Sequence, residues 1–192
     1  MFTRTRKTLL AVLASATMVT AAACGTSTSD IQSGEGIAPT IQIQAVNDQT
    51  GPVAYAGLGA SRGAQLAIDE INEQQFLGEG VTLSLKQSDT AGKIDRAVAD
   101  LTKAVSDPQT AAILGPTMGQ QAAAVAPIAN QRKVPTIFTQ AGADGVVTGK
   151  YTFRATAPME SYYEIATRWL ADNNLKKISM IYNATYPTFA IL

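Results

Sequence analysis

Hydrophobic and polar positions follow two alternating spacings along the chain, which predicts strands and helices in turn. From Thr40 onward apolar residues occupy every second position, at Ile41, Ile43 and Ala45, as they do in a strand with one buried face. The next segment places its apolar residues three and four positions apart, so that they share one face of a helix. The residues of that face are Ala60, Ala64, Ala67, Ile68 and Ile71.

The same cycle repeats further along the chain. Alternating apolar residues at Val81, Leu83 and Leu85 predict a second strand. A second helical face follows, made of Ile94, Ala97, Val98, Leu101 and Val105. The remaining elements of this kind are a strand over 111–114, a helix over 120–131 and a strand over 136–138 that is entered at Pro135.

Strands separated by single helices need crossover connections, which place them in a parallel sheet with helices on both faces. The predicted fold class is therefore α/β, with a doubly wound parallel sheet. Beyond the sheet, Ser161 and Glu164 have the spacing of a capping box, which predicts the start of a further helix. Its inward residues are expected to be Tyr162, Ile165, Ala166, Trp169 and Leu170.

Residues 178–182 predict one more strand, and no closing helix follows it. A parallel strand without its helix is an unusual end for a sheet. We therefore expect the sequence to be a fragment or an early-terminated frame that lacks nearly all of a second domain.

The first forty residues have the features of an export signal and a tether. Residues 1–7 are positively charged, the run from Leu9 to Ala23 is apolar, and small residues precede Cys24, which predicts a secretory signal peptide. A permanent transmembrane anchor is the alternative, but the apolar run is shorter than the roughly 20 residues that a spanning helix needs. The stretch up to Pro39 is rich in Gly, Ser, Thr and Asp, which predicts a flexible tether.

Composition and charge narrow the possible functions. The chain has 192 residues, of which 46% are hydrophobic and 16% charged, as in a folded globular protein. Lys and Arg together equal Asp and Glu at 15 each, without a basic stripe that would bind nucleic acid. No histidine and only one cysteine are present, which excludes a Ser-His-Asp or Cys-His catalytic site, the usual zinc sites and an intramolecular disulfide. We expect neither an enzyme nor a cofactor.

Ligands of open parallel sheets bind at the carboxyl ends of the strands, and four loops of this chain are expected there. They are rich in glycine and small polar residues and cover 47–57, 88–92, 115–120 and 139–142. Gln120 opens a predicted helix, so amides near Gly119 and Gln120 can hold a carboxylate or another electronegative group. The alternative is that these glycines only serve turns.

The stretch from IQIQAVNDQTGPVAYAGLGASRGAQLAIDEIN through ILGPTMGQQAAAVAPIANQRKVPTIFTQAG resembles the type I periplasmic binding proteins, and within them the branched-chain amino acid group. The resemblance runs from about Ile41 to Tyr186. It implies two α/β lobes of flavodoxin-like order, a solute trapped between them, and a closed form that docks onto the permease of an ABC importer. The domains would then be a signal peptide (1–23), a lipid-anchored tether (24–39), a first lobe (40–155) and the start of a second (156–192).

The resemblance also implies where the solute binds. In the first lobe the contacts would come from Met118, Gly119 and Gln120 and from Gln140, Ala141 and Gly142. Amino-acid binders usually have a serine hydroxyl where this chain has Gly119, and often threonine or serine where it has Gly142. The side-chain amides of Gln120 and Gln140 can instead bind an amide, a sugar-like solute or an amino acid. Aromatic walls are expected at Tyr55 and Tyr186.

The placement of Cys24 resembles the bacterial lipoprotein signal, although Ala21 stands where that signal usually has leucine. The resemblance implies acylation of Cys24 and a location on the extracytoplasmic face of the cell membrane. Plain secretory cleavage, with Cys24 as a bystander, is the alternative. The predicted function is capture of a small polar solute for an ABC importer.

Three other functions stay open. A sensory or scaffold lipoprotein can share the fold, and the isolated first lobe can fail to bind because the second lobe completes the site. Gly57, Gly59 and Gly63 resemble a dinucleotide-binding fingerprint, but Gly57 lies well beyond Val46, whereas that fingerprint begins at the strand end.

Overall fold

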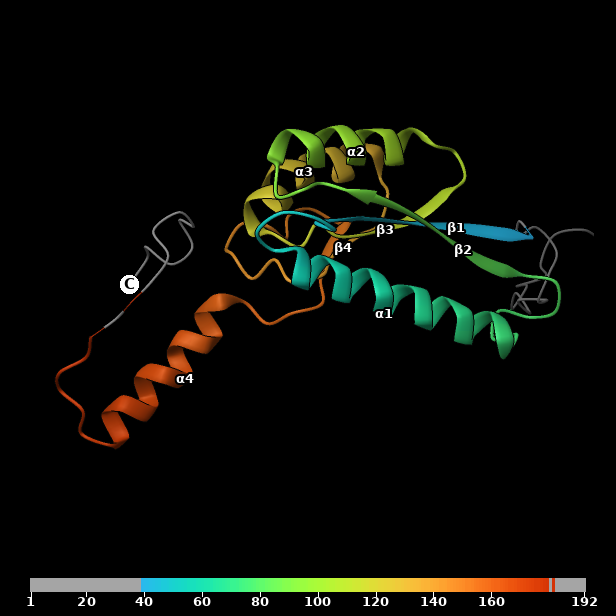
Figure 1. Ribbon diagram of the computed structural model, residues 1–192. Coiled ribbons are helices and arrows are strands. Elements are labelled where there is room, and N and C mark those ends of the chain that lie inside the picture. Colours follow the sequence, from blue (N-terminus) through green and yellow to red (C-terminus); the bar gives the residue numbers. More distant parts are fainter. Residues whose placement is uncertain (1–38, 180, 182–192) are drawn as a thin grey trace, which may run out of the picture. The chain divides into compact units, whose positions relative to one another are not determined.

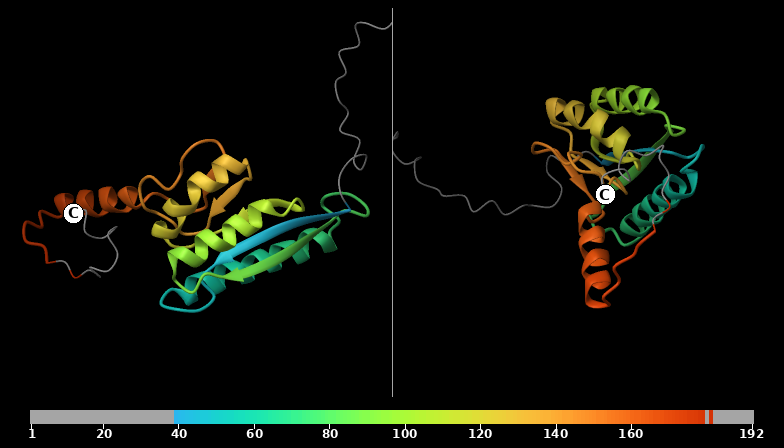
Figure 2. Two further views of the ribbon diagram at one scale, coloured as in Figure 1. Left: turned by 90° about the horizontal axis from the view of Figure 1, so that it is seen from above. Right: turned by 90° about the vertical axis from the view of Figure 1, so that its left-hand side faces the viewer.

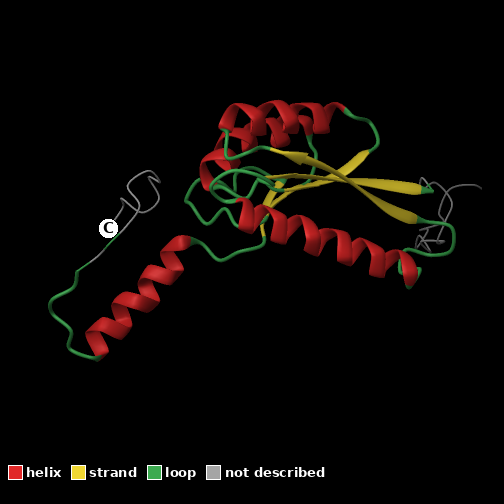
Figure 3. Ribbon diagram, in the orientation of Figure 1, coloured by secondary structure: helices red, strands yellow, loops and turns green. Residues whose placement is uncertain are grey.

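The computed structural model describes residues 39–179 and 181. The predicted signal peptide, nearly all of the tether, Cys24 and Tyr186 lie outside the described residues. The strands are β1 (Thr40–Asn47), β2 (Thr82–Asp89), β3 (Thr110–Leu114), β4 (Thr136–Phe138) and β5 (Thr152–Arg154) (Figures 1 and 3). The helices are α1 (Ala54–Glu73), α2 (Ile94–Ser106), α3 (Gly119–Arg132) and α4 (Met159–Asp172).

The strands form one parallel sheet in the order β2-β1-β3-β4-β5. Helix α1 covers one face of the sheet, and α2 and α3 lie together on the other (Figures 1 and 2). The predicted doubly wound α/β fold is therefore confirmed, and so is the strand order that the resemblance implied. Strand β5 is an addition that the sequence pattern did not reveal, because three residues are too few to show a period.

The core lies between the sheet and the pair α2 and α3. It is built from Val46, Ile113 and Phe138 on the strands and from Leu101 and Val125 on the helices, all of them at most 1% exposed. Burial of apolar side chains is the main favourable term in folding. This core therefore fixes the three central strands, whose carboxyl ends carry the loops described below.

Helix α1 buries the predicted face in part, with most of its fully buried residues nearer the start of the helix. Ile68 is buried as expected, whereas Ala67 is exposed and the other buried residues, Ala56, Gly57 and Ser61, lie nearer the start of the helix. The helix packs mainly on β1 and β2. Its first turns are held against the end of β1, where Gly57 meets the backbone of Asp48, and this contact sets the rotation of the helix.

The predictions for α4 were right about its existence and wrong about its start and its burial. The helix begins at Met159 after Pro158, and no side-chain capping bond forms, so the predicted box of Ser161 and Glu164 is absent. The residues that were expected to point inward include Ile165 and Trp169, which are 67% and 59% exposed. No residue of α4 is buried.

The predicted strand over 178–182 is not seen in its described part. Residues 178, 179 and 181 belong to no strand, and residues 180 and 182 lie outside the described residues. Within the part of the chain that the structure describes, no helix is both long enough and apolar enough to cross a bilayer.

Candidate functional site

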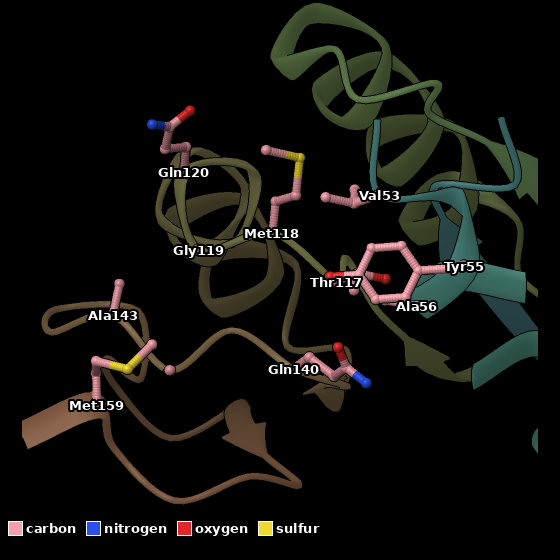
Figure 4. Close-up of a pocket in the computed structure, with 11 residues that line it drawn as sticks. Val53, Tyr55, Ala56, Thr117, Met118, Gly119, Gln120, Gln140, Ala143 and Met159 are labelled. Atoms are coloured by element: carbon pink, nitrogen blue, oxygen red, sulfur yellow. The ribbon is translucent and has the colours of Figure 1, made fainter. Parts of the chain in front are cut away.

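A cleft opens at the carboxyl ends of β1, β3 and β4 (Figure 4). Its walls come from the first residues of α1, the loop that leads into α3, the segment after β4 and the first residue of α4. The lining residues are Val53, Tyr55, Ala56, Thr117, Met118, Gly119, Gln120, Gln140, Gly142, Ala143 and Met159. The location agrees with the general rule for ligand sites of open parallel sheets.

The cleft brings together most of the residues that the sequence singled out. Tyr55, Met118, Gly119, Gln120, Gln140 and Gly142 all line it. Ala141 lies between two of them but is fully buried and lines no part of the cleft. Tyr186 lies outside the described residues. Three of the four loops predicted at the sheet edge thus face the cleft, and the loop over 88–92 does not.

The predicted side chains differ in how they face the cleft. Tyr55 is 80% exposed and lines the cleft from the first turn of α1 (Figure 4). The side chain of Gln120 is directed away from the other labelled residues (Figure 4). Gln140 is exposed at the rim. The lining is therefore mostly apolar, with polar side chains at its edges.

Ala143 and Met159 line the cleft without having been predicted: Ala143 is the residue after the predicted loop over 139–142, and Met159 returns to the cleft from beyond β5. The amide of Met159 donates to the carbonyl of Gly142 at 2.8 Å. A Cβ atom on Gly119 would lie only 2.8 Å from Cβ of Ala143, and a Cβ on Gly142 would touch Cε of Met159 at 3.7 Å. The methyl group of Ala143 therefore fills the space that a side chain on Gly119 would need.

Two adjacent buried residues at the end of β1 tie the cleft loops together. Asn47 is the first of them. Its amide nitrogen donates to Ser61 of α1 at 3.4 Å, and its oxygen accepts from the hydroxyls of Thr117 at 3.1 Å and Thr139 at 3.3 Å. Asn47 thereby links α1, the loop after β3 and the loop after β4.

Asp48 is the second of these residues, and it forms hydrogen bonds with the loop after β2 and with α3. Its Oδ1 accepts hydrogen bonds from the hydroxyl of Thr90, from the amide of Gly92 at 2.7 Å and from Nε2 of Gln121 at 2.9 Å. The loop over 88–92 is thus a support for α3 and not a wall of the cleft. Oδ2 of Asp48 and Oε1 of Gln121 are both buried and have no hydrogen-bond partner.

Asp89 fixes the first turn after β1. Its carboxylate accepts from the amide of Gln49 at 2.8 Å, from the amide and hydroxyl of Thr50 at 3.0 and 2.6 Å, and from the amide of Ala91 at 2.9 Å. Burial raises the pKa of Asp89, but the hydrogen bonds from Thr50, Ala91 and Gln49 outweigh it and lower the pKa from 3.8 to about 2. Asp89 is therefore ionised at neutral pH.

The chemistry of the cleft suits binding. None of its lining side chains is charged. The first residue of α3 follows Met118, which makes no side-chain capping bond, so the amides at this helix start face the cleft without a side-chain acceptor. Among residues 39–179 and 181, no group of three or more acidic, histidine or cysteine residues is placed to hold a metal ion.

Comparison with known proteins identifies relatives of the chain. The sequence profile of a family described as "Periplasmic binding protein" matches residues 40–190. No curated protein sequence matches the chain.

Solved structures of transporter-associated binding proteins resemble the chain. The substrate-binding protein of a branched-chain amino acid transporter from Streptococcus pneumoniae, solved with isoleucine, is 30% identical over 62% of this chain and 34% of its own length, with a TM-score of 0.57. An ABC transporter substrate-binding protein from Sphaerobacter thermophilus is 28% identical over 71% and 37%, with a TM-score of 0.61.

A solute-binding protein from Rhodopseudomonas palustris, solved with 3,4-dihydroxybenzoic acid, shares the fold at 22% identity over 79% and 41%, with a TM-score of 0.70. In each comparison the chain spans between a third and about two fifths of the length of the solved protein.

These comparisons confirm the resemblance inferred from the sequence. The family and its solved members are solute-binding proteins and not enzymes, which also confirms the prediction that the chain is not an enzyme. The dinucleotide-binding alternative is thereby set aside, and Gly57 serves instead to seat α1 on Asp48.

Proposed function

The chain belongs to the periplasmic binding protein family, and from this membership and the geometry of the cleft we propose that it forms the first lobe of a solute-binding protein for an ABC importer. In this proposal a small polar solute, such as an amino acid or an amide, is captured between two lobes and delivered to a membrane permease. The observation that carries the proposal is the cleft at the carboxyl ends of β1, β3 and β4.

Several features of the cleft support capture of a small molecule. Its apolar walls of Val53, Met118 and Met159 can pack against an apolar part of the solute, and Tyr55 can cover it. The amides at the start of α3 can bind an electronegative group. Gln140 at the rim can add a side-chain hydrogen bond.

The test is a thermal-shift measurement on the chain with amino acids, their amides and small polar metabolites. A ligand at 100 times its Kd adds about 2.7 kcal/mol to the free energy of unfolding. For a chain of this size this corresponds to a rise of about 5–10 °C in Tm. The same panel is applied to a longer form that carries a second lobe, because that lobe completes the proposed site. If no solute raises the Tm of either form, the proposal is contradicted.

A pair of matched variants separates binding in the cleft from binding elsewhere. Ala143→Phe places a large side chain into the lining, whereas Ala99→Phe places it on the exposed face of α2. The first should remove the ligand-induced rise in Tm and the second should keep it. An equal response of both variants would place the binding outside the cleft.

We also propose that Cys24 is acylated and holds the protein at the extracytoplasmic face of the membrane. Each buried CH₂ of an acyl chain adds about 0.8 kcal/mol of membrane affinity, and two chains make the anchoring stable. Labelled palmitate should enter the wild-type chain but not Cys24→Ser, which should leave the membrane fraction. Unchanged fractionation of Cys24→Ser would show that Cys24 is not the anchor.

A further inference from the structure

The buried carboxylate of Asp48 lies directly behind the start of α3. Gln121, the third residue of that helix, donates to Asp48 at 2.9 Å, while Gly119 and Gln120 before it line the cleft. Asp48 and Gln121 are both 0% exposed. The carboxyl group of Asp48 therefore lies beside the first turn of the helix whose start lines the cleft.

Several hydrogen-bond donors surround one oxygen of the Asp48 carboxyl group. Three of them converge on Oδ1, from Thr90, Gly92 and Gln121. Gly92 also leads into α2, whose first residue is Ile94, so the start of α2 lies beside this carboxyl group, whereas α3 reaches it through the side chain of Gln121. A carboxylate at this place would offset the positive end of the dipole of α2 and act on the start of α3 from behind.

Among the described residues, no lysine or arginine forms a salt bridge with Asp48. The salt bridge found among the described residues joins Lys86 to Asp107, and none of the residues that line the cleft is charged. Arg154 donates to the carbonyls of Gly142 at 3.4 Å and Ala143 at 3.3 Å, which places its guanidinium behind the opposite wall. The two walls of the cleft are thus backed by charges of opposite sign.

From this arrangement we infer that Asp48 determines the specificity of the cleft, by making the start of α3 a site for a neutral polar group and not for a carboxylate. The inference rests on the proposed solute-binding function. A helix start normally favours anions through its amides and its dipole. Here a buried anion behind those amides repels a second one, because Coulomb interactions are weakly screened away from solvent.

The packing at Gly119 supports the same specificity. A serine at this position, which would offer a hydroxyl to a carboxylate, would bring its Cβ to 2.8 Å from Cβ of Ala143. The solute class that fits is one with an amide, an alcohol or another uncharged polar group toward α3. An anionic group of the same solute would lie toward the Gly142 and Ala143 wall, which Arg154 backs.

A reporter thiol measures the electrostatic potential at this helix start without any ligand. In a Cys24→Ser chain, Gln120→Cys places a single thiol at the second position of α3. Thiols at helix starts usually titrate below their ordinary value of about 8.5. We expect the Gln120→Cys thiol to titrate at or above that value, measured from its rate of alkylation against pH.

Removing the carboxylate of Asp48 should restore the lowered thiol pKa that is usual at a helix start. Asp48→Asn keeps the shape and the acceptor oxygen, and should lower the pKa of the Gln120→Cys thiol by about one unit, whereas Asp69→Asn on the exposed side of α1 should not. A Glu160→Cys thiol in the first turn of α4 serves as the reference. A Gln120→Cys thiol as acidic as this reference, in a chain that keeps Asp48, would overturn the inference even if Asp48→Asn does not fold.

A second arm compares a carboxylate with its amide, using L-leucine and L-leucinamide. The amide is expected to bind at least about fivefold more tightly, and Asp48→Asn should shift the preference toward the acid. Tighter binding of L-leucine that Asp48→Asn leaves unchanged would overturn the inference while supporting solute capture. If no solute of the panel binds but the thiol behaves as expected, the proposed function fails while the electrostatic role of Asp48 stands.

Discussion

The sheet region, β1 to β5 with α1 to α3, and the helix α4 carry the same kind of amphipathic pattern, yet they differ in what they bury. In the sheet region Leu101, Val125 and Phe138 are fully buried. In α4 no residue is buried, although Ile165 and Trp169 share a helical face. A pattern determines that a helix forms and which face is apolar, but burial requires a second surface that matches that face.

The largest expected change in stability comes from comparing an aromatic residue of the sheet region with one of α4. Phe138→Ala removes a side chain that is 0% exposed and should lower the free energy of unfolding by about 3–5 kcal/mol. Trp169→Ala removes one that is 59% exposed and should change it by less than about 0.5 kcal/mol. Urea denaturation measures both. A loss of similar size in the two variants would mean that α4 packs on a surface in solution.

Two glycine-to-alanine substitutions in α1 test how closely the start of this helix packs against the end of β1. A Cβ on Gly57 would fall 1.9 Å from the carbonyl oxygen of Asp48, so Gly57→Ala should cost about 1–3 kcal/mol through displacement of the helix. Gly59→Ala has open space around it and should instead stabilise the helix by about 0.5–1 kcal/mol. Thermal unfolding separates the two. Equal stability of both variants would show that the start of α1 is loosely held.

Acid unfolding probes the loop after β1. The pKa of Asp89 is about 2 in the folded chain and 3.8 for an ordinary aspartate, so its contribution to stability is fully present above about pH 4 and is lost as the pH falls toward 2. Asp89→Asn should therefore lower Tm at pH 7 and make no difference below pH 2. Thr50→Val, which removes one donor, should reproduce part of the effect. A difference in Tm that stays constant from pH 7 to pH 2 would contradict this account.

The smallest effect is expected for a polar substitution on α4. Ile165→Gln exchanges a side chain that is 67% exposed and should leave Tm within about 1 °C of the wild type. Hydrogen exchange complements this variant, because amides of α4 should exchange much faster than those of α3, which buries Val125 and Ala129. Protection of α4 equal to that of α3 would remove the distinction between the two regions.

The spacing of apolar residues predicted most of the helices and strands, because this spacing reflects local structure and does not depend on tertiary contacts. The strand over 136–138 and the helix that starts at Ile94 agree with their predicted positions. The errors occur where long-range contacts decide. Ala67 was expected inside, but the contact between Gly57 and Asp48 rotates α1, and Ser161 was expected to cap a helix that already begins after Pro158.

The candidate site could also be predicted in part from the sequence. Loops rich in glycine at strand ends pointed to Gly119 and Gly142, because the carboxyl ends of parallel strands meet at one edge. Met159 had no such signal, since it reaches the cleft only through β5 and the turn at Pro158. Asp48 also escaped notice, because its partners Thr90 and Gln121 are 42 and 73 residues away in the chain.

By itself the sequence determined the α/β class, the alternation of elements and the strand ends at which a ligand is expected to bind, because these follow from local periodicity and from the direction of parallel strands. Only the tertiary structure decided which residues at the start of α1 are fully buried, that the methyl group of Ala143 fills the space beside Gly119, and that a carboxyl group lies behind the start of α3. These depend on contacts between residues distant in the chain, where packing and charge act through space and leave no periodic trace in the sequence.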